Sequence, residues 1–214
     1  MMKYKGVYLK LFSMLLKKPM REAYGKETTR KALKGAPKIY REMLTQVDDI
    51  GADNPMASNI YMCFVLMAVW KAGNGAITPE TFGPVIKKMA RTPMMTKMLG
   101  KRDMNQPDAV QGSLKGLYAK KAWADSRPQY RDKTWDYNID ENKHRDGVYY
   151  YFTNCPLNNF ARKYGYMEIL PVCCDLDYLI TEANHGVLHQ EQTLATGGTM
   201  CDYWVVPDKI RDPR

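Results

Sequence analysis

The chain has 214 residues, of which 45% are apolar, 26% charged and 11% aromatic. This composition is globular and excludes a disordered tail protein, a collagen-like repeat and a small disulfide scaffold. The longest apolar run, Ile60–Trp70, has eleven residues, whereas a membrane span needs about 20. The first residues contain scattered lysines and no small-residue cleavage site. We therefore expect a cytoplasmic protein without a membrane partner.

The net charge of +9 is spread unevenly along the chain. Residues 1–50 carry a net +7, residues 51–150 a net +5 and residues 151–214 a net −3. The lysines fall at helical spacing between apolar residues, with no Arg-rich block and no motif that reads nucleic acid. This pattern favours solvated helix faces and no nucleic-acid partner. A positive field that attracts a small anionic substrate is compatible with it.

Residues 1–127 have helical patterns. Apolar residues from Val7 to Leu15 recur at helical spacing, and Pro19 is expected to stop that helix. A second helix begins near Arg21 and should be broken by Gly35 and Pro37. Further helices are expected over residues 39–47, from Asn54-Pro55 to Gly73, from Thr78 to about Arg91, and over residues 94–100 and 108–124.

From residue 133 the hydrophobic period changes to that of strands. Four strands are predicted over residues 134–139, 147–153, 187–194 and 200–206, and two helices, 157–164 and 167–183, lie between the second and third strands. The predicted class is α+β, with a helical N-terminal region (1–127) packed on an antiparallel four-stranded sheet, and two helices inserted before the last hairpin. Region 128–214 carries the cysteine motifs, and both regions are expected to form one compact domain.

Four of the five cysteines fall in the last third of the chain, and Cys63 lies in the apolar run. The odd count without a signal sequence argues against a disulfide framework. Cys155 directly precedes Pro156 at the expected start of a helix, where free N–H groups and the helix dipole favour a thiolate. A small buried hydrophobic residue is the alternative interpretation of Cys155.

Cys173 and Cys174 lie about 100° apart on a helix and cannot both face one site. Cys174 shares a helix face with Asp177, which leaves Cys173 in the core and makes Asp177 a candidate polar partner in a site. Asp175 points elsewhere and fits a solvated face.

Two histidines and an acidic residue complete the set of candidates. His185 lies in a C-terminal helical turn, which suits an imidazolium without any function, and His189 lies on the next strand. Either histidine is a candidate general base. Cys201 and Asp202 are neighbours on a strand, so their side chains should face opposite sides of the sheet.

Zinc is the competing explanation for these cysteines. Cys155, Cys174 and Cys201 with one histidine would provide a tetrahedral, sulfur-rich ligand set. No CxxC or HxxxH motif is present, however, and the separations of the three cysteines are unlike those of a zinc ribbon. Thiol chemistry without a cofactor is therefore preferred, with zinc as the alternative.

Three linked segments resemble the L-2-amino-thiazoline-4-carboxylic acid hydrolase family. They are Cys155-Pro156-Leu157, the C-x-x-D step of Cys174 to Asp177, and the T-L-x-x-G-x-x-x-C-D ending over Thr193–Asp202. The resemblance is strongest over residues 147–206, and the helical front matches in general character only. Gly198 departs from the family, which often has an acidic residue there.

The resemblance implies a hydrolase that opens 2-aminothiazoline-4-carboxylate to N-carbamoyl-cysteine. Implied catalytic residues are a cysteine nucleophile (Cys155, or else Cys174 or Cys201), Asp177, and His189 for proton transfer. Implied substrate-binding residues are Arg162 for the carboxylate, and Asp202 and His185.

The alternative class is a non-catalytic small-molecule-binding or redox-sensing domain, similar in layout to vinyl-reductase-associated domains. The sequence leaves a homo-oligomer open.

Overall fold

The computed structural model describes residues 1–209, and these divide into two compact units. The first unit consists of Met1–Ala90 and Leu157–Asp175; the second consists of Arg91–Pro156 and the residues from Leu176 onward. The chain therefore passes from one unit to the other three times. The boundary near residue 127 and the single compact domain stay predictions.

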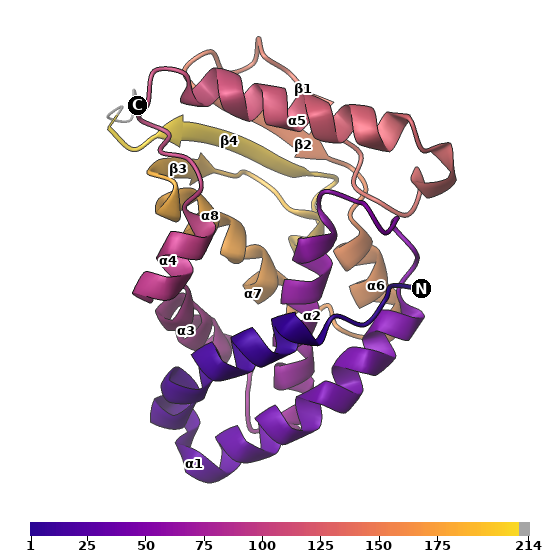
Figure 1. The fold of residues 1–214 in the computed structure, drawn as a ribbon, viewed down its shortest axis with the longest axis vertical. Coiled ribbons are helices and arrows are strands. Elements are labelled where there is room, and N and C mark those ends of the chain that lie inside the picture. Colours follow the sequence, from indigo (N-terminus) through magenta and orange to yellow (C-terminus); the bar gives the residue numbers. More distant parts are fainter. Residues whose placement is uncertain (210–214) are drawn as a thin grey trace. The chain divides into compact units, whose positions relative to one another are not determined.

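The first helix of the first unit is bent at a glycine. α1 (Gly6–Gln46) runs in two arms that meet at Gly25, whose φ of 77° lies in the left-handed region (Figure 1). The predicted stop at Pro19 and break at Pro37 are wrong, because both prolines lie inside the helical arms. The fixed φ of proline fits a helix and its cost is one lost hydrogen bond, whereas only glycine adopts a positive φ easily.

α2 (Ala57–Ala72) forms the centre of the first unit, and the apolar run from Ile60 to Val69 is almost wholly buried. α1 packs along it, and α3 (Pro79–Ala90), α6 (Pro156–Tyr164) and α7 (Leu170–Cys174) complete this unit. Phe64 of α2 contacts Phe160 of α6 with ring centroids 4.5 Å apart. None of the helices within residues 1–209 is both long and apolar enough to cross a membrane.

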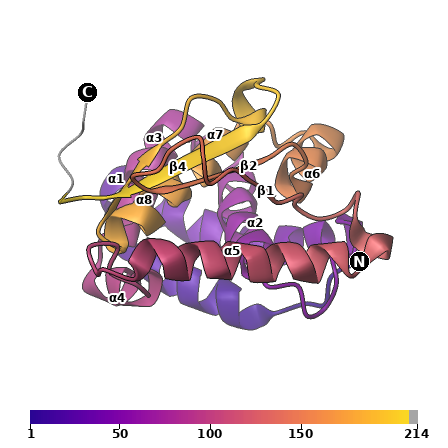
Figure 2. The ribbon, with the colours of Figure 1, turned by 90° about the horizontal axis from the view of Figure 1, so that it is seen from above.

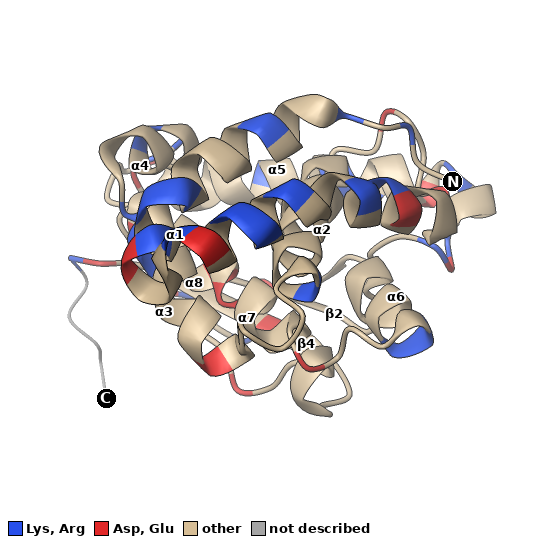
Figure 3. Ribbon diagram, turned by 90° about the horizontal axis from the view of Figure 1, so that it is seen from below, with Lys and Arg blue, Asp and Glu red and all other residues tan. Residues whose placement is uncertain are grey.

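Lys and Arg positions recur along α1 (Figure 3). Ten Lys and Arg residues between Lys10 and Arg41 are exposed, and the buried residues of the helix recur at spacings of three and four on its other side. Among these lysines, Lys31 pairs with Glu27 one turn away. These features agree with the interpretation of the basic segment as a solvated helix face.

The second unit combines helices with the sheet. α4 (Pro93–Leu99) contacts α8 (Leu176–Ala183), and α5 (Ala109–Asp125) runs alongside the sheet and contacts β2 (Figure 2). A short 3-10 turn, Pro128–Tyr130, follows α5 and leads to the first strand.

The four strands are β1 (Asn138–Ile139), β2 (Val148–Phe152), β3 (Gly186–His189) and β4 (Cys201–Pro207). They form one antiparallel sheet in the order β1-β2-β4-β3, which confirms the predicted α+β class. β1 and β3 are shorter than expected because two carboxylates accept hydrogen bonds from backbone N–H groups that would otherwise be available for strand pairing. Asp136 accepts hydrogen bonds from residues 153 and 154, and Asp202 accepts them from residues 191 and 192.

The register gives the sheet two chemically different faces. Cys201 and Tyr203 lie opposite Phe152 and Tyr150 of β2, and these four side chains define what we call the cysteine face. The other face, the tryptophan face, carries Asp202, Trp204, Tyr149 and His189. A glycine permits the close pairing at one end, because a Cβ on Gly147 would lie 2.3 Å from the carbonyl oxygen of Val205.

The single helix expected over residues 167–183 is instead two helices, α7 and α8, separated at Asp175. Asp177 consequently lies in the first turn of α8 rather than in mid-helix.

Candidate functional site

A carboxyl group with a perturbed pKa contacts the cysteine face. Asp177 on α8 accepts a hydrogen bond from the hydroxyl of Tyr203 at 3.0 Å. Burial raises the pKa of Asp177 to about 6, and the Tyr203 hydrogen bond opposes this only in part. The Tyr203 ring stacks on Tyr150, with centroids 4.7 Å apart and planes within 3°. A carboxyl that titrates near neutral pH can both donate and accept a proton under ordinary conditions.

Cys201 lies on the same face but is a poor nucleophile. Its side chain is 5% exposed, and its Sγ accepts a hydrogen bond from the backbone N–H of Leu194 at 3.3 Å. Burial raises the pKa of the Cys201 thiol, and the negative charges of Asp177, Asp202 and Asp136 raise it further. The thiol therefore stays protonated and unreactive at neutral pH.

Cys155 occupies the predicted position at a helix start. It directly precedes α6 and is partly exposed. It lies three residues after Phe152, which pairs with Cys201 across strands β2 and β4. That the backbone N–H groups at the start of α6 favour a thiolate at Cys155 stays a prediction.

Asp136, which the sequence interpretation did not single out, fixes the segment leading to Cys155. Its carboxylate accepts the backbone N–H of Thr153 at 2.8 Å and that of Asn154 at 2.6 Å, and the Thr153 hydroxyl also donates to it. The Asn154 side chain donates to the carbonyl of Thr134 at 2.6 Å. Aspartate is depleted in β-strands, so its presence inside the predicted strand 134–139 is the sequence signal that could have identified Asp136.

His189 and Asp202 lie on the tryptophan face, opposite to Cys201 and Tyr203. The Asp202 side chain is 4% exposed, and its carboxylate accepts the backbone N–H groups of Glu191 and Gln192 at 2.9–3.2 Å. Asp202 therefore holds the loop after β3. The His189 ring lies beside Trp204, with centroids 4.5 Å apart.

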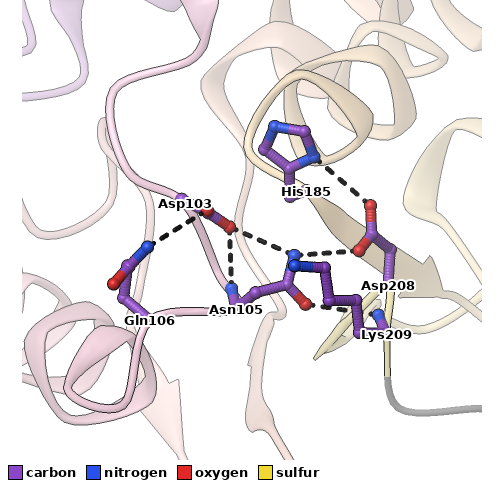
Figure 4. Close-up of polar contacts among 6 residues, drawn as sticks. All are labelled: Asp103, Asn105, Gln106, His185, Asp208 and Lys209. Atoms are coloured by element: carbon purple, nitrogen blue, oxygen red, sulfur yellow. Dashed lines mark hydrogen bonds and ion pairs between the residues drawn. The ribbon is translucent and has the colours of Figure 1, made fainter.

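His185 belongs to a separate polar cluster at the turn between α8 and β3 (Figure 4). Its Nδ1 lies 3.4 Å from a carboxylate oxygen of Asp208, and its φ is 56°. The Asn105 amide bridges Asp208 and Asp103, at 2.9 and 3.1 Å. These contacts tie the segment before α5 to the end of β4.

The remaining candidates belong to the first unit. Cys173 is 2% exposed in α7 and Cys63 is 6% exposed in α2, as expected of core residues. Cys174, the last residue of α7, is partly exposed, and Arg162 is exposed in the last turn of α6. That Cys155, Cys174 and Cys201 converge on one pocket stays a prediction. Within residues 1–209, no three Cys, His, Asp or Glu side chains gather into a group that could hold a metal ion.

Fold and site together define an α+β protein in which a protonatable carboxyl on α8 contacts the sheet near a buried thiol, with a second thiol at a helix start. The family model of the L-2-amino-thiazoline-4-carboxylic acid hydrolases matches residues 56–205, and the chain belongs to this family. The match extends beyond the C-terminal motifs to α2, in the helical front. Neither the comparison with curated proteins nor that with solved structures found a match.

Proposed function

We propose that the protein is a hydrolase that opens the ring of a small cyclic amidine carboxylate, with 2-amino-thiazoline-4-carboxylate as the reference substrate and N-carbamoyl-cysteine as its product. The observation that carries this proposal is the Asp177 carboxyl on the cysteine face, whose pKa is about 6. Ring opening requires a proton for the departing sulfur and removal of a proton from water. A group that titrates near neutral pH performs both steps.

Cys155 is the proposed nucleophile. It is partly exposed and directly precedes α6, whereas Cys201 is buried and its thiol pKa is raised. Cys174 remains the second candidate because it too is partly exposed. Of the other candidates, Arg162 is proposed to pair with the substrate carboxylate, and His185, His189 and Asp202 have no step in this scheme.

In the proposed first step, the Cys155 thiolate attacks the amidine carbon of the protonated substrate. The carbon–sulfur bond of the ring breaks, its electron pair stays on the departing sulfur, and protonated Asp177 supplies the proton. The product is an S-linked isothiouronium on Cys155 with the ring open.

In the second step, water attacks the same carbon and gives its proton to the Asp177 carboxylate. The bond from carbon to Cys155 Sγ breaks, the thiolate is regenerated, and loss of the remaining hydroxyl proton to solvent leaves the urea group of the product. One water is consumed, one proton is released and no redox change occurs.

The test is turnover of 2-amino-thiazoline-4-carboxylate by the full chain, followed by mass spectrometry of the product. Cys155→Ser should abolish turnover, and Cys173→Ser should retain it, because Cys173 is buried in α7. Denaturation during turnover should capture a protein adduct with the added mass of one substrate molecule on Cys155. Full activity of Cys155→Ser refutes the nucleophile. Saturable binding without turnover by the wild type refutes the hydrolase and supports a binding module.

A further inference from the structure

The tryptophan face contains a hollow that the proposed reaction does not use. It has a volume of about 360 Å³ and is lined by the loop between β1 and β2, by β2 and β4, by the end of β3 and the segment after it, and by Tyr178 of α8. That volume is within the range of small-molecule sites. Its walls include Lys143, His144, His189, Glu191 and Trp204.

An indole with two imidazoles forms the aromatic wall of this hollow. The Trp204 Nε1–H donates to Asp146 Oδ1 at 3.2 Å, which fixes the ring. His144 stacks on Trp204 with centroids 4.0 Å apart and planes within 10°, and His189 lies at 4.5 Å. Two of the three histidines of the chain thus meet at one tryptophan. Such a surface suits a flat ring.

Charges of opposite sign accompany this wall. The Lys143 ammonium donates to the Tyr149 hydroxyl at 2.8 Å and lies 4.2 Å from the centre of its ring. The pKa of Lys143 is raised, first by this hydrogen bond and also by the charges of Glu191 and Asp202, so the side chain stays cationic. Because the Asp202 carboxylate is occupied by backbone N–H groups, the exposed Glu191 is the available anion.

We propose that this hollow binds a small flat zwitterion. Its carboxylate pairs with Lys143, its cationic nitrogen pairs with Glu191, and its ring packs against Trp204 and the two imidazoles. A ligand that carries both charges can pair with both groups, whereas a singly charged ligand pairs with one of them, which favours a zwitterion. Neither Cys155 nor Asp177 lines this hollow, so the proposal stands whether or not the proposed hydrolysis does.

The three histidines allow a site-resolved test. The full chain is labelled with ¹³C in histidine only, and L-tryptophan is added as the flat zwitterionic probe. The resonances of His144 and His189 should shift in a saturable manner, while that of His185 stays in place as an internal reference. Tryptamine and indole-3-propionate, each of which carries one of the two charges, should bind about tenfold more weakly.

Substitutions identify the two charged contacts. Lys143→Gln and Glu191→Gln should each weaken L-tryptophan binding about tenfold, since a charge-assisted hydrogen bond is lost. Lys115→Gln, a change of the same charge on exposed α5, should not. Failure of His144 and His189 to shift at millimolar concentrations of L-tryptophan overturns the proposal. Equal shifts of all three histidines, or equal binding of tryptamine and L-tryptophan, overturn it as well.

Discussion

Replacement of Asp177 by asparagine tests the central electrostatic feature of the cysteine face. The carboxyl has a pKa of about 6 in the folded protein, against about 4 in an unfolded chain. The folded state therefore binds the proton more tightly, and this stabilisation is fully present below pH 4 and is lost as the pH rises through 6. A pKa difference of about two units corresponds to about 3 kcal/mol of folding free energy. We reduce this value to about 2 kcal/mol because Asp177 is partly accessible to solvent.

Asparagine has nearly the same shape and can still accept the Tyr203 hydrogen bond, but it has no charge to bury. Asp177→Asn should therefore raise the free energy of unfolding at pH 7.5 by about 2 kcal/mol relative to the wild type, while the two proteins should be nearly equal at pH 4. Urea unfolding at several pH values measures this difference. Other titrating groups are the same in both proteins and cancel.

A difference that stays constant from pH 4 to pH 7.5 would refute the argument, because the carboxyl would then titrate in the folded protein as it does in the unfolded chain. Tyr203→Phe is the companion variant. It removes the hydroxyl that donates to Asp177, so the pKa of that carboxyl should rise further, by about one unit. The pH window of falling stability should then extend to about pH 7.

Three further predictions concern the thiols and the segments that support them. Iodoacetamide at pH 7 should modify Cys155 well before Cys201, because Cys201 is buried and the pKa of its thiol is raised. Peptide mapping measures the two rates, and faster modification of Cys201 would contradict the choice of Cys155 as the reactive thiol. Asp136→Ala should lower the free energy of unfolding by about 2 kcal/mol and speed hydrogen exchange at Thr153 and Asn154, whose N–H groups lose their acceptor; unchanged exchange there would contradict this. Gly147→Ala should destabilise by about 2 kcal/mol in urea unfolding, since the added Cβ meets a strand carbonyl at 2.3 Å, and a neutral result would mean that β4 moves freely.

The helical region shows which local signals decide a structure. Apolar spacing predicted that residues 7–15 and 39–47 are helical, but proline was given too much weight as a terminator. Pro19 and Pro37 lie inside the arms of α1, and the bend is at Gly25, the position with a positive φ. A glycine marks a bend in a helix only when the helical arms before and after it pack in different directions. For α1 that packing involves α2, which is distant in sequence.

The sheet was more accessible to prediction, because alternating side chains are a local property. The segment around β2 predicted a strand, and the expected opposition of Cys201 and Asp202 follows from the same alternation. The electrostatics of the site were not accessible in this way. Burial raises the pKa of Asp177, and the hydroxyl of Tyr203, 26 residues away, lowers it in part. Asp136 acts on Asn154, 18 residues away. No local pattern contains these pairs.

The interleaving of the two units has a consequence for how the protein is made. Residues 157–175, which complete the first unit, emerge from the ribosome after most of the second unit has been synthesised. The second unit in turn lacks α8, β3 and β4 until the last part of the chain appears. Neither unit can finish folding during early translation, because each needs contacts between segments that are distant in the sequence, and such contacts slow folding. A fragment that ends at residue 90 or 156 would expose apolar surface that later segments cover in the full chain. Deletion of residues 157–175, or of the residues from 176 onward, would therefore destabilise a unit whose other part lies far away in the sequence.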